Sequence, residues 1–191
     1  MGEAAKLLHP VREFRAWRTK VWYKVLHDEK FDKSDKAMHK LGKINHPLTL
    51  TACVNLLTNN LPEVRSWAAA EIGVKKKYMA TDEELRSRIY DKIEKLLLSD
   101  KEYIRDAAIE AITQINDPAF AVRCIGNLVG ARKQAYADDI SLIIRIIDVL
   151  DEYKAKTQNA EKMLRWMLKE PSYERYREDI RNALGSKNGS T

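Results

Sequence analysis

The sequence is poor in the two residues that most often make turns. Only seven glycines and five prolines occur in 191 residues. A fold rich in β-strands needs many tight turns, and glycine and proline are their strongest markers. Alanine, leucine, lysine, arginine and glutamate are abundant instead, and these residues favour helices. The composition therefore predicts an all-α protein.

Cysteine is also scarce, since only Cys53 and Cys124 are present. Two cysteines so far apart do not form a disulfide framework, so we expect reduced thiols and a cytoplasmic protein. No apolar run approaches the roughly 20 residues of a membrane-spanning helix. The richest run, Leu142 to Leu150, is interrupted by Arg145 and Asp148. No membrane partner is therefore expected.

Signatures of catalysis and metal binding are missing too. No glycine-rich run precedes a Lys-Ser or Lys-Thr pair, and no Gly-x-Ser-x-Gly elbow is present. The histidines have no partner at metal-ligand spacing; they are His9, His27, His39 and His46. His46 is expected to cap a helix or form a turn. We therefore expect no metal and no cofactor, and favour a non-catalytic protein over an enzyme.

The formal net charge of +6 is concentrated near the N-terminus, where residues 1–24 carry six cations against two glutamates. Phe14, Trp17, Trp22 and Tyr23 interleave with these cations. Such a pattern can serve nucleic acid through phosphate contacts and base stacking. The favoured interpretation is a helix that caps a helical stack, with its aromatic side chains sealing the end and its cations in water.

The chain contains an internal repeat. Residues 61–73, LPEVRSWAAAEIG, match residues 103–113, YIRDAAIEAIT, when Arg65 is aligned with Arg105, 40 positions later. Apolar and small residues lie three and four apart in both segments, as in a helix that packs one face. A period near forty residues indicates a helical repeat protein.

Two further pairs of residues support the repeat. Pro47 and Pro118 are 71 positions apart, and so are Cys53 and Cys124. This separation corresponds to two repeats of about 35 residues. The cysteines are therefore predicted to occupy equivalent core positions.

The boundaries of these segments resemble those of HEAT repeats. A helix that closes with Leu41-Gly42-Lys43-Ile44 is followed by two polar residues and Pro47, and Asn116-Asp117-Pro118 repeats the end of this pattern. The pattern is similar to the bacterial and archaeal HEAT repeats found in phycobilisome-lyase-like proteins. The resemblance implies a right-handed α-solenoid of helical hairpins. It also implies structural contacts for the repeated arginines, with Asn60 beside Arg65 and Asp100 beside Arg105.

Three parts are predicted along the chain. A basic aromatic helix and its connector occupy residues 1–33, a HEAT-like repeat array occupies 34–185, and a disordered tail occupies 186–191. The first helix is expected to start at Pro10 and to run to about Leu26. Asp100 is expected to N-cap a later helix. Array helices are expected near 37–44, 47–58, 61–73, 82–98, 100–115, 118–129, 138–153, 159–169 and 172–184.

The third repeat can be aligned in two ways. An offset of 40 residues places Asp148 on the buried position of Ala108, where an unpaired carboxylate would be strongly destabilising. An offset of 35 places Arg145 and Asp148 on the positions of Glu110 and Thr113, so we adopt it. One continuous polar surface is then predicted to contain Asp106, Glu110, Arg145 and Asp148.

These four residues and Trp67 form the predicted partner-binding set, because Trp is enriched in interaction hot spots. For Trp67 itself, the favoured interpretation is that it fills a gap between repeats. The surface has an acidic excess, which suits a basic, extended protein segment better than a phosphate backbone. The leading prediction is a non-catalytic scaffold that binds another protein.

The alternative prediction is nucleic-acid binding. Its candidate residues are Arg12, Arg15, Arg18, Lys75, Lys76 and Lys77. Some HEAT-like solenoids are alkylpurine DNA glycosylases that use Trp and Asp side chains. The sequence supplies these residue types without a local motif, in Trp67, Asp148, Asp151 and Trp166.

Overall fold

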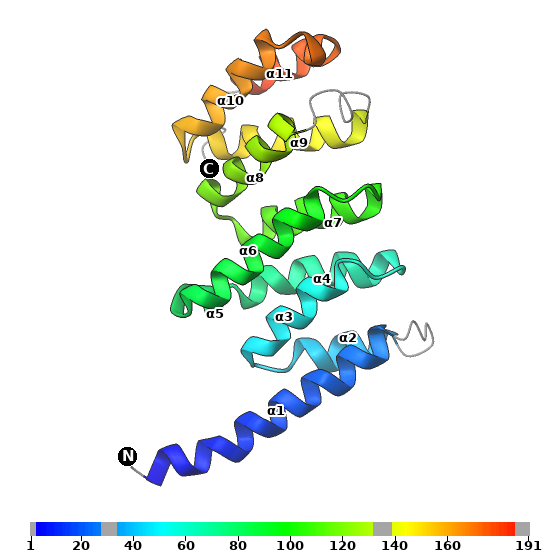
Figure 1. Ribbon diagram of the computed structural model, residues 1–191, viewed down its shortest axis with the longest axis vertical. Coiled ribbons are helices and arrows are strands. Elements are labelled where there is room, and N and C mark those ends of the chain that lie inside the picture. Colours follow the sequence, from blue (N-terminus) through cyan, green and yellow to red (C-terminus); the bar gives the residue numbers. More distant parts are fainter. Residues whose placement is uncertain (1–2, 28–33, 132–138, 186–191) are drawn as a thin grey trace. The chain divides into compact units, whose positions relative to one another are not determined.

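The computed structural model describes residues 3–27, 34–131 and 139–185 (Figure 1). Within these ranges the chain consists of helices and short connections, without a strand, which confirms the all-α prediction. It divides into two compact units, Met1–Leu96 and Leu97–Thr191. Among the described helices, none combines the length and the apolar character needed to span a membrane.

The first unit is built from successive helix pairs. Its helices are α1 (Glu3–His27), α2 (Ser34–Gly42), α3 (Pro47–Leu56), α4 (Pro62–Lys75), α5 (Lys77–Thr81) and α6 (Glu83–Leu97). Helix α1 packs against α2, and α3 packs against α4. Contacts of α1 with α3 and of α2 with α4 join the two pairs into two layers. Helix α1 is therefore an integral part of this unit.

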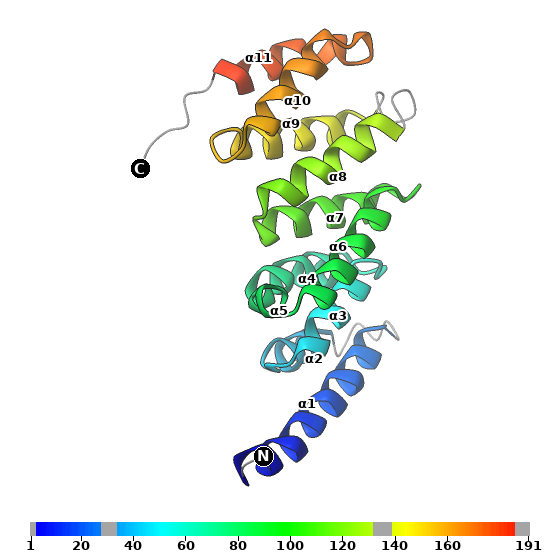
Figure 2. The same cartoon turned by 60° about the vertical axis from the view of Figure 1, so that its left-hand side comes forward.

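The starts of α3 and α1 in this unit can be compared with the starts predicted from the local sequence. Helix α3 begins at Pro47 because the residue before it, His46, provides a side-chain cap: its Nδ1 accepts a hydrogen bond of 3.1 Å from the Leu48 N–H. The expected capping role of His46 is confirmed. Helix α1, however, begins at Glu3 and continues through Pro10, where its start was predicted. The first turns of α1 extend beyond α2 and α3 in both views (Figures 1 and 2).

A buried lysine joins α4 to the end of α2. Lys75 Nζ donates a hydrogen bond of 2.8 Å to the Gly42 carbonyl and lies 3.2 Å from Glu71 Oε2. Lysine charge at the C-terminus of a helix is favourable because the last carbonyls carry partial negative charge. Gly42 permits the close approach, since a Cβ atom there would lie 3.1 Å from Glu71 Oε1 and 3.6 Å from Trp67. Trp67 is thus half-buried against α2.

The second unit repeats the same design. Its helices are α7 (Glu102–Ile115), α8 (Pro118–Ala131), α9 (Ile140–Lys154), α10 (Gln158–Lys169), the 3-10 helix η2 (Pro171–Tyr176) and α11 (Arg177–Gly185). Helix α9 packs against α7 and α11, and α10 packs against α8. These contacts form one layer of α7, α9 and α11 and another of α8 and α10. The pairs α7–α8, α9–α10 and α10–α11 connect the layers.

Both cysteines lie in the core, as predicted. Cys53 follows Pro47 of α3 by six residues, and Cys124 follows Pro118 of α8 by six residues. Neither Cys53 nor Cys124 is in a disulfide, and both are fully buried. Burial raises the pKa of Cys53 well above its usual range, and Glu71 contributes in the same direction.

Several predicted boundaries differ from the structure. The N-cap of α7 is Lys101 rather than Asp100, and it provides no side-chain cap. Helix α5 was not predicted, and the last predicted helix is divided into η2 and α11, with Tyr173 in a non-helical conformation. Asn116 ends α7 with a left-handed φ of 55°, which asparagine tolerates better than most residues. The predicted tail at 186–191 lies outside the described residues.

Candidate functional site

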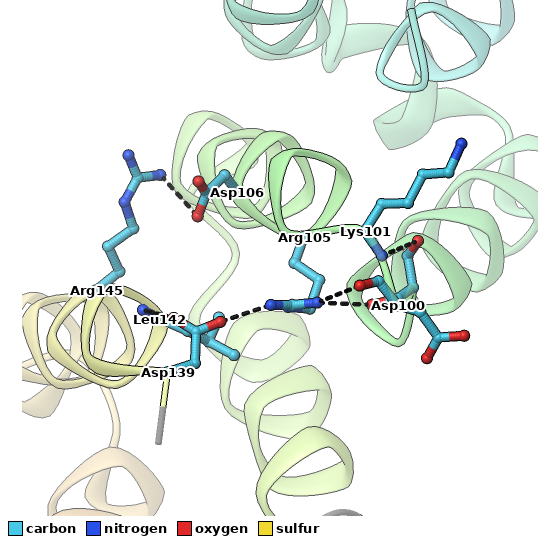
Figure 3. Close-up of polar contacts among 8 residues, drawn as sticks. Asp100, Lys101, Arg105, Asp106, Asp139, Leu142 and Arg145 are labelled. Atoms are coloured by element: carbon cyan, nitrogen blue, oxygen red, sulfur yellow. Dashed lines mark hydrogen bonds and ion pairs between the residues drawn. The ribbon is translucent and has the colours of Figure 1, made fainter. Parts of the chain in front are cut away.

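A buried arginine organises the contact between α7 and α9 (Figure 3). Arg105 Nη1 donates to the main-chain carbonyls of Ser99 and Asp100, at 3.0 and 3.2 Å. Its Nη2 lies 2.5 Å from Asp139 Oδ2. The planar guanidinium can donate to the carbonyls before α7 and to the Asp139 carboxylate at the same time, because its N–H groups diverge in a fixed fork.

Asp139 has a second function at the start of α9. Its Oδ1 accepts a hydrogen bond of 3.0 Å from the Leu142 N–H and so caps the helix. One carboxylate therefore sets where α9 begins and ties that point to α7. The equivalent Arg65 of α4 donates to the carbonyls of Asn59 and Asn60, at 2.8 and 2.9 Å. The residues implied by the HEAT resemblance, Asn60 and Asp100, are thus partners through their main-chain oxygens.

The N-caps show the true register of the third repeat. Lys101 precedes α7 and Asp139 precedes α9, and these residues are 38 positions apart. This offset aligns buried residues with buried residues: Ile104 with Leu142, Ala108 with Ile146, Ile112 with Leu150 and Ile115 with Tyr153. The 35-residue offset was therefore wrong by three positions. The argument against the 40-residue offset holds: that offset would bury Asp148, whereas Asp148 is exposed and aligns with Glu110.

The predicted polar residues of α7 and α9 do lie together. Arg145 Nη1 is 3.7 Å from Asp106 Oδ1 across the two helices (Figure 3). Beside this pair is a hollow of about 430 Å³, which contains Glu110, Arg145 and Asp148. The remaining lining residues are Ile109, Thr113, Gln114, Val149 and Glu152. This first hollow has an apolar floor and a polar, mainly acidic rim.

Asp148 also borders a second hollow, of about 240 Å³, between α9 and α11. Asp151 and Asp179 line it together with Ile144 and Ile147. The pKa of Asp148 is raised, chiefly by partial burial of the carboxyl group and further by repulsion from Asp151 and Asp179. Asp179 was missed in the sequence, because no local pattern shows that α11 brings it beside α9.

We call the surface formed by the two hollows the acidic face; its carboxylates are Glu110, Asp148, Asp151, Glu152 and Asp179. Three cations offset part of its charge: Arg145 pairs with Asp106, Lys154 lies 2.7 Å from Asp151, and Lys156 lies 3.4 Å from Glu152. Within the described part of the chain, Asp148 and Asp179 form no ion pair. The face can therefore accept additional positive charge.

Trp67 and Trp166 do not share these hollows. Trp67 is in α4 of the first unit, against Gly42. Trp166 lines a separate hollow of about 440 Å³ between α8 and α10, with Arg123 and Lys162. The second unit thus does not bring Trp166 and the aspartates Asp148 and Asp151 to one hollow, as a glycosylase-like arrangement would require.

The predicted nucleic-acid residues are not equally available. Arg12 and Arg15 are exposed on α1, Arg18 is partly exposed, and Lys76 and Lys77 are exposed around the start of α5. Lys75 is only 5% exposed and bonds Gly42, so it does not belong to a basic surface. The periodicity of α4 predicts which face Lys75 is on, but not that α2 ends against it.

The aromatic residues of α1 also differ from the prediction. Phe14 and Trp17 are 56% and 58% exposed, so they do not seal the end of a stack. Their rings stack at 5.9 Å, and the Arg18 guanidinium lies 5.8 Å from the centre of the Phe14 ring. Thr19 and Leu26, on the opposite side of α1, are the buried positions that pack inward.

No group of three or more metal-ligating side chains is present among the residues that the structure describes. Nothing matches this chain in comparisons with protein-family models, curated proteins and solved structures. The HEAT-like resemblance therefore stays a prediction, and functional inference rests on the surfaces described above.

Proposed function

We propose that the protein is a non-catalytic, cytoplasmic scaffold of HEAT-like hairpins, arranged as a right-handed α-solenoid, that binds a basic, extended segment of a protein partner. The acidic face is the proposed binding surface. The repeated helix pairs of both units and the two-layer packing within each unit support this architecture. Helical repeat proteins commonly bind partners through extended surfaces of this kind.

The observation that carries the proposal is the position of Asp148. It lies on α9 where the two hollows meet, and its pKa is raised chiefly by partial burial and further by repulsion from Asp151 and Asp179. Carboxylates that repel one another are stabilised when a cation approaches them. A lysine or arginine of the partner would supply that cation.

The apolar parts of the acidic face suit the same kind of side chain. Ile109 and Val149 line the first hollow, and Ile144 and Ile147 line the second. Lysine and arginine bury their aliphatic stems on apolar surface while their charged ends reach polar groups. A segment with alternating basic and apolar residues therefore fits this face best.

A labelled peptide of alternating lysine and leucine tests the proposal by fluorescence anisotropy. The wild-type protein should bind this probe and should not bind a matched peptide of glutamate and leucine. Asp148→Asn combined with Asp179→Asn should weaken binding about tenfold, since two carboxylates that face the probe lose their charge.

The control removes two negative charges from the first unit, by Glu63→Gln and Asp91→Asn, which are exposed on α4 and α6. This variant should bind the basic probe like the wild type. Equal weakening in both double variants would show that only net charge matters. Such a result, or unchanged binding in the Asp148 and Asp179 variant, would reject the acidic face as the site.

One observation favours nucleic-acid binding as a second candidate function. Phe14 and Trp17 are exposed on a helix that also presents Arg12, Arg15 and Arg18, and exposed aromatics among cations can stack bases. Charge reversal of the three arginines should then abolish binding of a single-stranded oligonucleotide. Binding that persists after this reversal would exclude α1 as the nucleic-acid surface.

A further inference from the structure

The outward face of α1 is an apolar surface that the first unit leaves uncovered. Phe14, Trp17 and Val21 are all exposed and lie at positions i, i+3 and i+7 of one helix. This spacing places them on one side, as the anchors of a helix that docks into a groove. We call these three residues the aromatic stripe.

Cations flank the aromatic stripe on both sides. Arg18 lies against Phe14 on one side, while Lys20 and Lys24 are exposed about one and two turns after Trp17 on the other. Lys20 and Lys24 form no ion pair among the described residues. An occupant of the stripe must therefore offer apolar surface bordered by negative charge.

This charge decides against pairing of α1 with α1 of a second copy. The described side chains of α1 include Arg12, Arg15, Arg18, Lys20 and Lys24. Glu13 is the sole carboxylate among the described side chains of α1. Two such helices side by side would bring like charges together, which is destabilising.

The acidic face of the second unit has the complementary properties. Ile144 is 40% exposed and lines the second hollow, Ile109 and Val149 line the first, and Asp148 and Asp179 provide carboxylates without ion-pair partners in the described residues. We propose that the aromatic stripe of one copy of this chain docks on the acidic face of a second copy. This inference rests on the proposed function, because it names the partner of that binding surface.

The two surfaces differ, so the contact is heterologous: each copy uses its stripe toward one neighbour and its acidic face toward another. Heterologous contacts produce rings or open chains rather than closed two-fold dimers. The interface consists of one helix face and two shallow hollows, which is small for a stable complex. The association is therefore weak, in the micromolar range, and it weakens with salt.

Two variants that each lose one surface test the inference by analytical ultracentrifugation. The stripe variant carries Phe14→Ala and Trp17→Ala, and the face variant carries Asp148→Lys and Asp179→Lys. All four positions are exposed, so circular dichroism and melting should show both variants folded. The wild type should sediment as larger species with rising concentration, and each variant alone should be monomeric. Loss of the aromatic anchors should raise the dissociation constant about thirtyfold.

Mixing the two variants provides the decisive measurement. The mixture retains one intact stripe and one intact acidic face, so it should form a one-to-one dimer that grows no further. A wild-type chain that stays monomeric at all concentrations overturns the inference, and so does a mixture that stays monomeric. Self-association of the stripe variant overturns it as well.

The lysine–leucine peptide separates failure of this inference from failure of the proposed function. A monomeric wild type that still binds the peptide through Asp148 and Asp179 rejects the second copy as partner and leaves the acidic face as a binding site. If the face variant is unstable, Asp148→Asn with Asp179→Asn replaces it in the mixture, with the same expected outcome.

Discussion

Arg105 of α7 and Asp139, the N-cap of α9, form a close ion pair, with 2.5 Å between Nη2 and Oδ2 and side chains that are only 7% and 16% exposed. The same two helices share a second pair, Arg145 and Asp106, at 3.7 Å with Arg145 46% exposed. One interface thus contains a buried and an exposed ion pair. Because the two pairs differ in their exposure to water, they should contribute differently to the free energy of unfolding.

Removal of the buried guanidinium should destabilise the protein far more than removal of the exposed one. Arg105→Ala removes the hydrogen bonds to Asp139 Oδ2 and to the carbonyl oxygens of Ser99 and Asp100, and breaking a buried pair costs about 3–5 kcal/mol. Arg145→Ala should cost less than about 1 kcal/mol, because water and salt screen the exposed pair. Urea unfolding of both variants measures the difference. Equal costs would contradict the assignment of the buried pair as the main link.

The two functions of Asp139 can be separated. Asp139→Asn keeps an oxygen that can cap α9 and loses the charge that faces Arg105, whereas Asp139→Ala loses both. The alanine variant should therefore be less stable than the asparagine variant by about 1 kcal/mol, the usual value of an N-cap. Identical free energies of unfolding would show that the cap contributes nothing.

Lys75 should behave as a core residue, unlike the lysine that follows it. Lys75→Met removes the donor to the Gly42 carbonyl and leaves Glu71 without its cation. A cost of about 2–4 kcal/mol is expected, since a buried charge and a carbonyl lose their partner. The exposed Lys76→Met variant is the matched control and should change stability by less than about 0.5 kcal/mol. A stable Lys75→Met protein would contradict the buried role.

The stability of the first unit should depend on the protonation of His46. Nδ1 must be unprotonated to accept from Leu48 N–H, and the pKa of His46 is lowered by burial and by Arg12 and Arg15. A lowered folded-state pKa means that the stabilisation is present above pH 6.5 and is lost as the pH falls through the folded-state value. His46→Asn keeps a capping side chain and should remove this part of the pH dependence. Melting curves of both proteins between neutral and mildly acidic pH measure the difference; parallel curves would refute it.

Neither cysteine should react in the native protein. Cys53 and Cys124 are fully buried, and the raised pKa of Cys53 disfavours the reactive thiolate. A thiol reagent should label both residues only after denaturation, while an introduced cysteine at the exposed Ser87 should react at once. Fast labelling of Cys53 or Cys124 would mean that these positions open readily in solution.

Local periodicity was enough to predict the helical class, the core positions of the cysteines and the exposure of Asp148. Each of these properties depends on which side of a helix a residue occupies, and the 3.6-residue period is present in the sequence itself. The capping role of His46 was predictable from local sequence too, because the cap joins residues only two positions apart.

Only the tertiary structure decided which neighbouring helix, if any, covers each side of a given helix. Lys75 is buried because α2 ends against it, and Phe14 and Trp17 are exposed because the first unit has no helix on that side of α1 within the described residues. The offset of 38 residues and the position of Asp179 depend on helix lengths, connections and packing between distant segments. Those contacts join residues far apart in the chain, and no local pattern contains them.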